Sequence, residues 1–206
     1  MNMLSGIYFP DGGQIKVNGE VVSIQSPKDA FRLGIGMIHQ HFKLIPVFSA
    51  AENIILGEQG GKYDLRAAEQ KLSELAERYG FRLNPKQKVY ELSVSEKQTV
   101  EIMKVLYRGA DILILDEPTA VLTPQETERL FAILRKMRED GKSILIITHK
   151  LTEVLALSDR VAVLRKGQYI GAVETAKADV TLLTEMMVGE KVKLGIDRAA
   201  PLNGPR

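Results

Sequence analysis

Cysteine is absent from the 206-residue sequence. The chain therefore has no disulfide framework, no cysteine-ligated zinc site and no thiol nucleophile. It also lacks an apolar run approaching the roughly 20 residues of a membrane-spanning helix. Its N-terminus shows neither the basic nor the apolar region of a secretory signal. We therefore expect any membrane role to come through a partner.

An excess of one charge is also missing. The 28 Lys and Arg residues nearly balance the 26 Asp and Glu residues, which leaves a formal net charge of +2. A nucleic-acid-binding protein usually shows a basic excess or a basic cluster, so no nucleic-acid partner is expected. The 45% of apolar and 26% of charged residues are typical of a globular protein. The length suits one α/β domain, with or without a small subdomain.

Alternating strand and helix patterns predict an α/β fold with a mostly parallel sheet. Hairpins are predicted around Asn18-Gly19 and Lys166-Gly167. The main strands are expected over 34–38, 111–115 and 143–148. One helix is expected to end near residue 4, and a short helix is expected after Ser26. Longer helices are expected over 64–79, 96–107, 124–140 and 180–188.

The organisation of the domain follows from these patterns. No strand separates the two helices between residues 64 and 110, so we expect a helical subdomain at about 63–110, inserted on the sheet. The pattern dissolves after Gly189. This predicts one α/β domain over 1–189 and a tail or linker over 190–206.

Two carboxylates follow the most apolar predicted strand. Four aliphatic residues, 112–115, lead directly to Asp116 and Glu117. Ligands of α/β sheets bind at the carboxyl ends of the strands. One carboxylate can hold Mg²⁺ through its water shell, and the next can orient or deprotonate an attacking water. The structural alternative is a polar strand end that enters a turn at Pro118.

Polar residues also follow the other two strands. His149 ends the strand predicted over 143–148, where it could hydrogen-bond a phosphate, although a lone histidine is often structural. Gln40 follows the strand 34–38 and could reach the metal or the water. His39 and His41 have no further ligands at the spacing of a zinc site.

The segment Leu92-Ser93-Val94-Ser95-Glu96-Lys97-Gln98 precedes a predicted helix. Free N–H groups at a helix start, together with the helix dipole, favour an anion. A serine there can equally serve as a simple N-cap. Both interpretations stay open for this segment on its own.

Taken in order, these residues resemble the ATPase domain of ABC transporters over about residues 1–189. Gln40 matches the Q-loop, residues 92–96 the signature motif, Asp116 and Glu117 the Walker B pair, and His149 the switch histidine. Further stretches resemble the importers of simple sugars and nucleosides, and most of all the nucleoside branch. They are GMIHQHF (36–42), AENI (51–54), YRGAD (107–111), PTAVLTPQE (118–126) and MVG (187–189).

The resemblance implies a P-loop NTPase-like ABC ATPase fold with ATP and Mg²⁺ as cofactors. It implies that Glu117 acts as the base on water, that Asp116 and Gln40 serve Mg²⁺, and that His149 holds the γ-phosphate. The signature residues Leu92, Ser93, Val94, Ser95 and Glu96 would contact the ATP of a second ATPase domain. That domain would be a second half of the same chain, as is usual in this group, or the other subunit of a homodimer.

The resemblance also implies partners and a location. Transmembrane permease subunits would dock on residues 41–62, and a substrate-binding lipoprotein or periplasmic protein would act indirectly. The protein would then lie on the cytoplasmic face of the cell membrane, as a peripheral subunit that hydrolyses ATP to import nucleosides or simple sugars.

Two departures from the family pattern stand out. No phosphate-binding G-x-x-x-x-G-K-[ST] motif is present, since the Gly-Lys-Ser at 141–143 precedes a strand. The resemblance implies that this chain begins just past that loop, as an N-terminally truncated domain that alone does not hydrolyse ATP. The second departure is Ser95, which replaces the second glycine of the signature and adds a side chain where backbone approaches a γ-phosphate.

Two alternatives remain open at this point. The chain could be a non-catalytic remnant that only binds a permease or another ATPase half, which the missing loop favours. It could also be a soluble ABC ATPase of repair or translation, although such proteins lack the importer-like stretch after Gln40.

Overall fold

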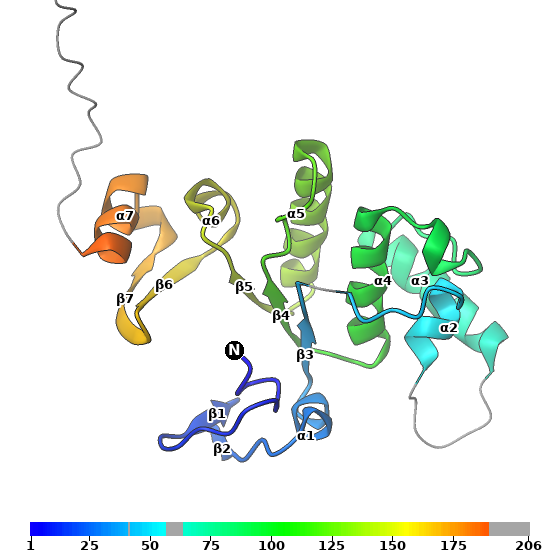
Figure 1. Ribbon diagram of the computed structural model, residues 1–206, viewed down its shortest axis with the longest axis horizontal. Coiled ribbons are helices and arrows are strands. Elements are labelled where there is room, and N and C mark those ends of the chain that lie inside the picture. The colour runs from blue at the N-terminus through cyan, green and yellow to red at the C-terminus, as the bar shows by residue number, and fades with distance from the viewer. Residues whose placement is uncertain (41, 57–63, 190–206) are drawn as a thin grey trace, which may run out of the picture. The chain divides into compact units, whose positions relative to one another are not determined.

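The computed structural model describes residues 1–40, 42–56 and 64–189 (Figure 1). The chain forms two compact units, Met1–Thr148 and His149–Arg206. The predicted tail at 190–206, His41 and residues 57–63 lie outside the described residues.

The first unit begins with the predicted hairpin. Strands β1 (Ile15–Val17) and β2 (Glu20–Val22) pair antiparallel. The turn residues Asn18 and Gly19 both have positive φ, 53° and 86°, as a two-residue type I′ turn requires. Helix α1 (Pro27–Arg32) follows, with Ser26 as its N-cap, as predicted.

Residues 1–4 form hydrogen-bonded turns, so the prediction of a helix there is wrong. The N–H of Gly6 donates to the carbonyl of Met3, and that of Ile7 to the carbonyl of Asn2. With Gly6 at φ 74°, this is the bonding pattern that ends a helix. The terminating glycine was predicted correctly, but too few i→i−4 bonds precede it to make a helix.

Three parallel strands form the central sheet of the described residues, in the order β3 (Ile35–Ile38), β4 (Ile112–Asp116) and β5 (Ser143–Ile147). In the register, Ile38 lies opposite Leu115, and Asp116 lies opposite Ile147. Strand β4 is central and its middle residues are fully buried, which explains its unbroken aliphatic run. The carboxyl ends of all three strands therefore meet at one edge.

The sheet has a packed layer on each face. On one face, Ile24 and Ala30 pack with Ile35 and Ile114. Residues of opposite parity point to the other face. There a Cβ added at Gly36 would come within 2.8 Å of the Cβ of Val105. Helix α4 (Val94–Tyr107) therefore lies very close to β3, and α5 (Pro124–Glu139) packs against β5.

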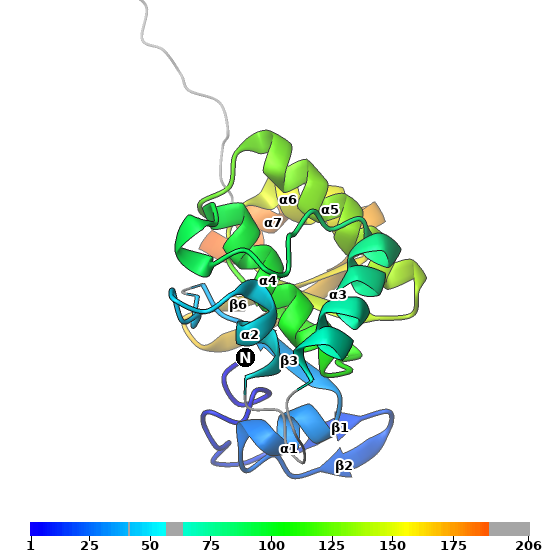
Figure 2. The ribbon, with the colours of Figure 1, turned by 90° about the vertical axis from the view of Figure 1, so that its right-hand side faces the viewer.

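A cluster of helices adjoins the sheet in the first unit (Figure 2). Helix α2 (Ala50–Ile55) packs against both α3 (Leu65–Tyr79) and α4. The sequence predicted α3, with Gly80 as its terminator at φ 81°, and most of α4. It did not predict α2, because six residues are too few to display a helical period.

The second unit contains α6 (Leu151–Leu157), the antiparallel hairpin of β6 (Arg160–Arg165) and β7 (Gln168–Glu174), and α7 (Val180–Val188). The hairpin turn at Lys166-Gly167 and helix α7 were predicted, whereas α6 was not. Leu183 of α7 is fully buried in this unit. No helix among the described residues is long and apolar enough to span a membrane.

Candidate functional site

Gln40, Asp116 and Glu117 lie at the carboxyl edge of the central sheet. Asp116 is the last residue of β4, and Gln40 comes two residues after the end of β3. The N–H of Glu117 donates to the carbonyl of Ile147 at 2.9 Å, so the pairing with β5 continues past Asp116. Both carboxylate residues are half-buried and Gln40 is exposed. The sheet therefore brings these three predicted residues to one edge.

Glu117 has a strained backbone. Its φ is 48°, in the left-handed region that is costly for residues other than glycine. Asn18 and Lys166 also have positive φ, but both lie in two-residue hairpin turns that require it. Glu117 lies in no such turn. A strained residue at the ligand edge of a sheet points to a functional role, because the surrounding structure must hold it there.

The signature segment starts helix α4. Ser93 is the N-cap: its hydroxyl accepts from the N–H of Glu96 at 3.3 Å, and the Glu96 carboxylate accepts from the N–H of Ser93 at 2.8 Å. This capping box begins the helix at Val94, two residues before the predicted start. The expected serine N-cap of this segment is thus Ser93, and Ser95 is the second helical residue.

The side chain of Ser95 faces the start of α5. The pKa of Glu126 is lowered chiefly by hydrogen bonds from the backbone and side chain of Thr123, and a hydrogen bond from Ser95 adds to this effect. Glu126 closes the predicted capping box of α5 with Thr123. Ser95 and Glu126 both line a groove of about 620 Å³ between the end of α3, the first turns of α4, and helix α5.

Two buried polar side chains of α4 reach the loops that follow β3 and β4. The amide of Gln98 donates to the carbonyl of Pro118 at 2.7 Å. The carboxylate of Glu101 accepts from the N–H of Lys43 at 2.8 Å. The two residues are 5% and 9% exposed. The helix that begins with the signature segment is therefore bonded to both loops of the candidate site.

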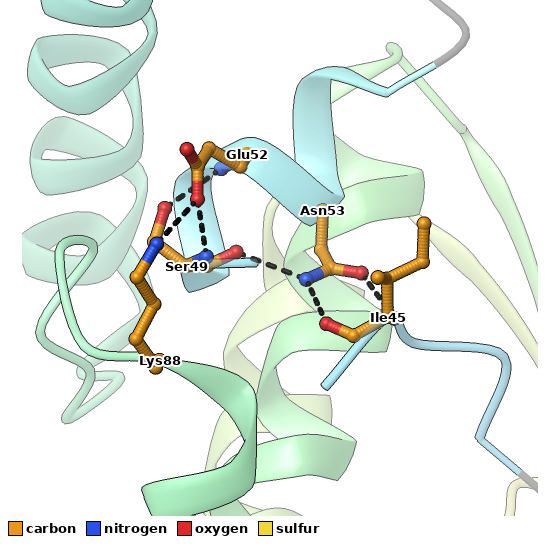
Figure 3. A network of polar contacts seen from close by, with 5 residues as sticks. All are labelled: Ile45, Ser49, Glu52, Asn53 and Lys88. Carbon is orange, nitrogen blue, oxygen red and sulfur yellow. Dashed lines mark hydrogen bonds and ion pairs between the residues drawn. The ribbon is translucent and has the colours of Figure 1, made fainter. Parts of the chain in front are cut away.

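The segment after Gln40 is held by a second set of polar contacts (Figure 3). Asn53 of α2 bonds to the backbone of Ile45 and to the carbonyl of Ser49. Glu52 accepts from Ser49 and Lys88, and the N–H of Ser49, followed by the Lys88 ammonium, lowers the pKa of the Glu52 carboxyl.

This segment also runs beside the residues that lead to the signature. The N–H of Val89 donates to the carbonyl of Phe48 at 2.9 Å, and that of Tyr90 to the carbonyl of Pro46 at 3.1 Å. The one-turn helix Val89–Glu91 then ends at Leu92. The backbone after Gln40 is therefore bonded to the backbone that enters the signature segment.

His149 begins the second unit, two residues after the end of β5, and is exposed. Its approach to Asp116 and Glu117 stays a prediction. His39 is half-buried, and His41 lies outside the described residues. Within residues 1–40, 42–56 and 64–189, no three His, Cys, Asp or Glu side chains gather as a metal site.

The oxygen donors at the sheet edge fit the chemistry of Mg²⁺. This ion is usually held by one or two protein oxygens together with phosphate oxygens and water. Asp116 supplies a carboxylate and Gln40 an amide oxygen at the same edge. The donor set is therefore suited to Mg²⁺ bound together with a nucleotide phosphate.

The structure adds Asn53, Gln98 and Glu101, which the sequence analysis did not single out. Gln98 and Glu101 are polar residues set among the buried apolar positions Val100, Ile102 and Met103. Asn53 likewise lies between the buried Ala51 and Ile54. A polar residue inside a short apolar stretch of the sequence was the signal that could have indicated these buried side chains. It does not reveal which residue each side chain bonds to.

The match to a family model decides the identity of the fold. The model described as ABC transporter matches residues 1–120, more than half of the chain. The chain belongs to the ABC transporter family. The resemblance expected from the motifs is thereby confirmed.

Curated relatives of this ABC family member are ATP-binding proteins of importers. The chain is 48% identical over 203 residues to the nucleoside import ATP-binding protein NupA of Lactococcus lactis, covering 97% of this chain and 40% of NupA. It is 46% identical to the guanosine import ATP-binding protein NupO of Bacillus subtilis, covering 99% and 41%. The ribose import ATP-binding protein RbsA 1 of Streptomyces avermitilis is 44% identical, covering 99% and 40%. The chain spans about two fifths of the length of these relatives.

Solved ABC cassettes share the fold. The ADP conformation of MJ1267, an ATP-binding cassette of an ABC transporter, superposes with a TM-score of 0.77 at 22% identity, covering 92% of this chain and 82% of that one. The dimeric structure of MJ0796, a bacterial ABC transporter cassette, gives 0.70 at 22% identity, covering 84% and 78%. The predicted ABC ATPase fold with a parallel sheet and helices is thus confirmed.

Proposed function

We propose that this chain is part of the ATP-binding subunit of an importer for nucleosides or simple sugars, in which ATP hydrolysis drives transport. One observation carries the proposal: three parallel strands in register bring Gln40, Asp116 and the strained Glu117 to one edge. The kinship with import proteins for nucleosides, guanosine and ribose supports the substrate class.

The three residues at this edge, and His149 of the second unit, have distinct tasks in the proposed reaction. The Glu117 carboxylate accepts a proton from the water whose oxygen attacks the γ-phosphorus, and the bond to the β-phosphate oxygen breaks to give ADP and phosphate. Asp116 and Gln40 would hold Mg²⁺, which would supply positive charge for the phosphate oxygens. His149 donates a hydrogen bond to the γ-phosphate.

The start of α4 serves a second nucleotide. The N–H groups of its first turn and the hydroxyl of Ser93 lie at the positive end of the helix dipole, which favours an anion. Leu92, Ser93, Val94, Ser95 and Glu96 would therefore contact the γ-phosphate of ATP that is bound to a second ATPase domain. In this arrangement two ATPase domains enclose the nucleotides between them.

The segment after Gln40 is the proposed contact with the membrane permease. Within the described part of the predicted stretch 41–62, the side chain of Val47 is exposed, as is that of Tyr90 beside it. The hydrogen bonds of Asn53 and Glu52 hold the backbone of this segment in place. The exposed apolar side chains of Val47 and Tyr90 are therefore suited to a rigid docking site. The permease would hold the subunit at the cytoplasmic face of the cell membrane, with a substrate-binding protein acting on the far side.

A second candidate function applies to a polypeptide of residues 1–206 acting by itself, which contains no G-x-x-x-x-G-K-[ST] motif. A polypeptide of residues 1–206 alone would lack the lysine and backbone cradle for the β- and γ-phosphates. We expect it neither to bind ATP tightly nor to hydrolyse it. It could then act only by binding a permease or another ATPase half.

Calorimetric titration with Mg-ATP separates the two candidates. We expect heats near the baseline for residues 1–206, and binding with turnover once a G-x-x-x-x-G-K-[ST] segment precedes Met1. Micromolar affinity with turnover in residues 1–206 alone would overturn the expected inactivity. Failure of the extended polypeptide to bind would favour the non-catalytic candidate.

Uptake by cells tests the substrate class. Cells that carry the intact gene region are compared with cells in which the Glu117 codon is changed to Gln, using radiolabelled guanosine and ribose. We expect Glu117→Gln to abolish uptake of the nucleoside and to leave ribose uptake unchanged if the nucleoside branch is correct. The opposite pattern would assign simple sugars, and unchanged uptake of both would contradict an importer of either class.

A further inference from the structure

Gln98 and Glu101 lie one turn apart on α4 and point into the protein rather than to solvent. Each ends on a main-chain atom in a different loop, the carbonyl of Pro118 and the N–H of Lys43. Pro118 directly follows Glu117, and Lys43 comes three residues after Gln40. One face of one helix therefore holds both loops that carry the candidate catalytic residues.

Burial makes these two bonds selective for one geometry. A buried amide or carboxylate without a partner costs more than the bond itself contributes, because water no longer solvates it. Only 5% of Gln98 and 9% of Glu101 is exposed to solvent. Displacement of either loop from α4 would leave a buried polar group unpaired, so the loops and the helix are expected to move together.

We propose that Gln98 and Glu101 are positioning residues, through which α4 sets the places of Glu117 and Gln40 relative to the signature segment at its own N-terminus. The catalytic consequence rests on the proposed function above. The mechanical part does not, because it concerns only contacts within the first unit.

The backbone of Glu117 explains why such support is needed. Its positive φ survives only where neighbouring bonds over-determine it. Those bonds include the donation of its own N–H to Ile147, the acceptance by its carbonyl from Ala120, and the bond of Gln98 to the adjacent Pro118. Removal of the Gln98 bond frees one side of this strained peptide and lets Glu117 relax.

The same helix would link two nucleotides. Its first turn would contact the ATP on the second ATPase domain, and its buried residues support the loops that serve the ATP of its own domain. A shift of α4 on contact with the partner's phosphate would therefore move Pro118 and Lys43. This couples closure of the two ATPase domains to the position of the water-activating carboxylate.

Hydrogen exchange in residues 1–206 tests the mechanical part. Gln98→Met keeps the length of the side chain but removes the donor. We expect exchange of the Glu117 and Ala120 amides to rise about tenfold or more. Glu101→Met should do the same at Lys43, whereas Glu101→Gln keeps an acceptor oxygen and should restore slow exchange there.

Ser26→Ala is the matched control. It removes the N-cap of α1 in the same unit, so it lowers stability without touching α4 or either loop. The amides of Glu117 and Ala120 should keep their exchange rates, after correction for global unfolding. Unchanged exchange at these amides in Gln98→Met, or an equal rise in Ser26→Ala, would overturn the proposal.

Turnover tests the catalytic part, in the polypeptide preceded by a phosphate-binding segment. A merely structural Gln98 would alter melting but not chemistry. A positioning Gln98 predicts that Gln98→Met lowers kcat about tenfold or more with the KM for ATP unchanged. A normal kcat together with fast exchange would overturn the positioning role. Absence of turnover in the parent polypeptide would overturn the proposed function, while hydrogen exchange would still decide the role of α4.

Discussion

The side chain of Asn53 forms a pair of hydrogen bonds with the backbone of Ile45. It accepts from the N–H of Ile45 at 2.7 Å and donates to its carbonyl at 3.0 Å (Figure 3). A further bond runs to the carbonyl of Ser49 at 3.0 Å. Asn53 is 1% exposed. One buried amide thus fastens the chain after Gln40 to helix α2.

Asn53→Ala should destabilise the protein by about 2–4 kcal/mol, because it removes three hydrogen bonds of a buried amide and leaves the N–H of Ile45 without its acceptor. Urea denaturation followed by circular dichroism measures this change. Gln70→Ala is the control, since the exposed side chain of Gln70 bonds to Glu74 on the surface of α3, and it should change the free energy of unfolding by less than about 0.5 kcal/mol. A loss as small as in the control would contradict the structural role of Asn53.

Stability should decrease at acidic pH partly through Glu52. The N–H of Ser49 and the ammonium of Lys88 hold the pKa of Glu52 below its ordinary value in the folded state. The Glu52 carboxyl of the unfolded protein therefore binds a proton more tightly than that of the folded protein. The contribution of Glu52 to the free energy of unfolding is fully present above about pH 4.3, the pKa of a free glutamate. This contribution is lost as the pH falls through the lower pKa of the folded state.

In Glu52→Gln the melting temperature should therefore fall less between neutral pH and about pH 3 than it does in the parent protein. Thermal melts across this range measure the slope. Glu128→Gln, which changes an exposed glutamate of α5, should keep the slope of the parent. A steeper acid limb in Glu52→Gln than in the parent would reverse the sign and refute the assignment.

Ser95→Gly, in the polypeptide with a phosphate-binding segment, should raise ATP-driven dimerisation and turnover. Glycine removes the Cβ that would stand close to the partner's γ-phosphate. The affinity of the monomer for nucleotide should stay nearly unchanged. Because Ser95 lies inside α4, the same change should cost about 0.5–1 kcal/mol of stability.

Ser95→Ala distinguishes the effect of the Cβ on turnover from that of the hydroxyl. It also loses the hydrogen bond to Glu126 but keeps the Cβ, so its turnover should stay close to that of the parent. Steady-state ATPase rates of the three proteins decide the matter. Equal rates for serine and glycine would mean that the side chain at this position does not limit closure.

Glu117→Gln should retain ATP binding but remove most hydrolysis in the same extended polypeptide, because an amide cannot accept the proton of the attacking water. Asp116→Asn should instead weaken the Mg²⁺-dependent part of ATP binding, since it removes a charged oxygen ligand. Calorimetry and single-turnover hydrolysis distinguish the two variants. Hydrolysis at the parental rate in Glu117→Gln would show that another group is the base.

Local rules account for much of what the sequence predicted. The Asn18-Gly19 hairpin, the capping box of Thr123 and Glu126, and the terminating Gly80 each depend on a few adjacent residues. The aliphatic run before Asp116 marked a buried parallel strand for a similar reason, since a central strand is apolar on both faces. Motif order then sufficed to recognise the ABC ATPase fold.

Short or overlapping sequence patterns gave wrong or missing predictions where tertiary contacts decide the secondary structure. Helices α2 and α6 are six and seven residues long, so their form depends on packing rather than on a visible period. The start of α4 was placed two residues late, because the Ser93–Glu96 capping box competes with an equally plausible Ser95 cap.

The sequence by itself predicted the candidate site residues and the strands that they follow. Only the tertiary structure decided that Gln98 bonds to Pro118, that Glu101 bonds to Lys43, and that Glu117 has a positive φ. The sequence separation between bonded residues is the physical reason. A polar residue in an apolar pattern shows that a buried partner must exist, but a partner 20 or 58 positions away is selected only when the chain packs.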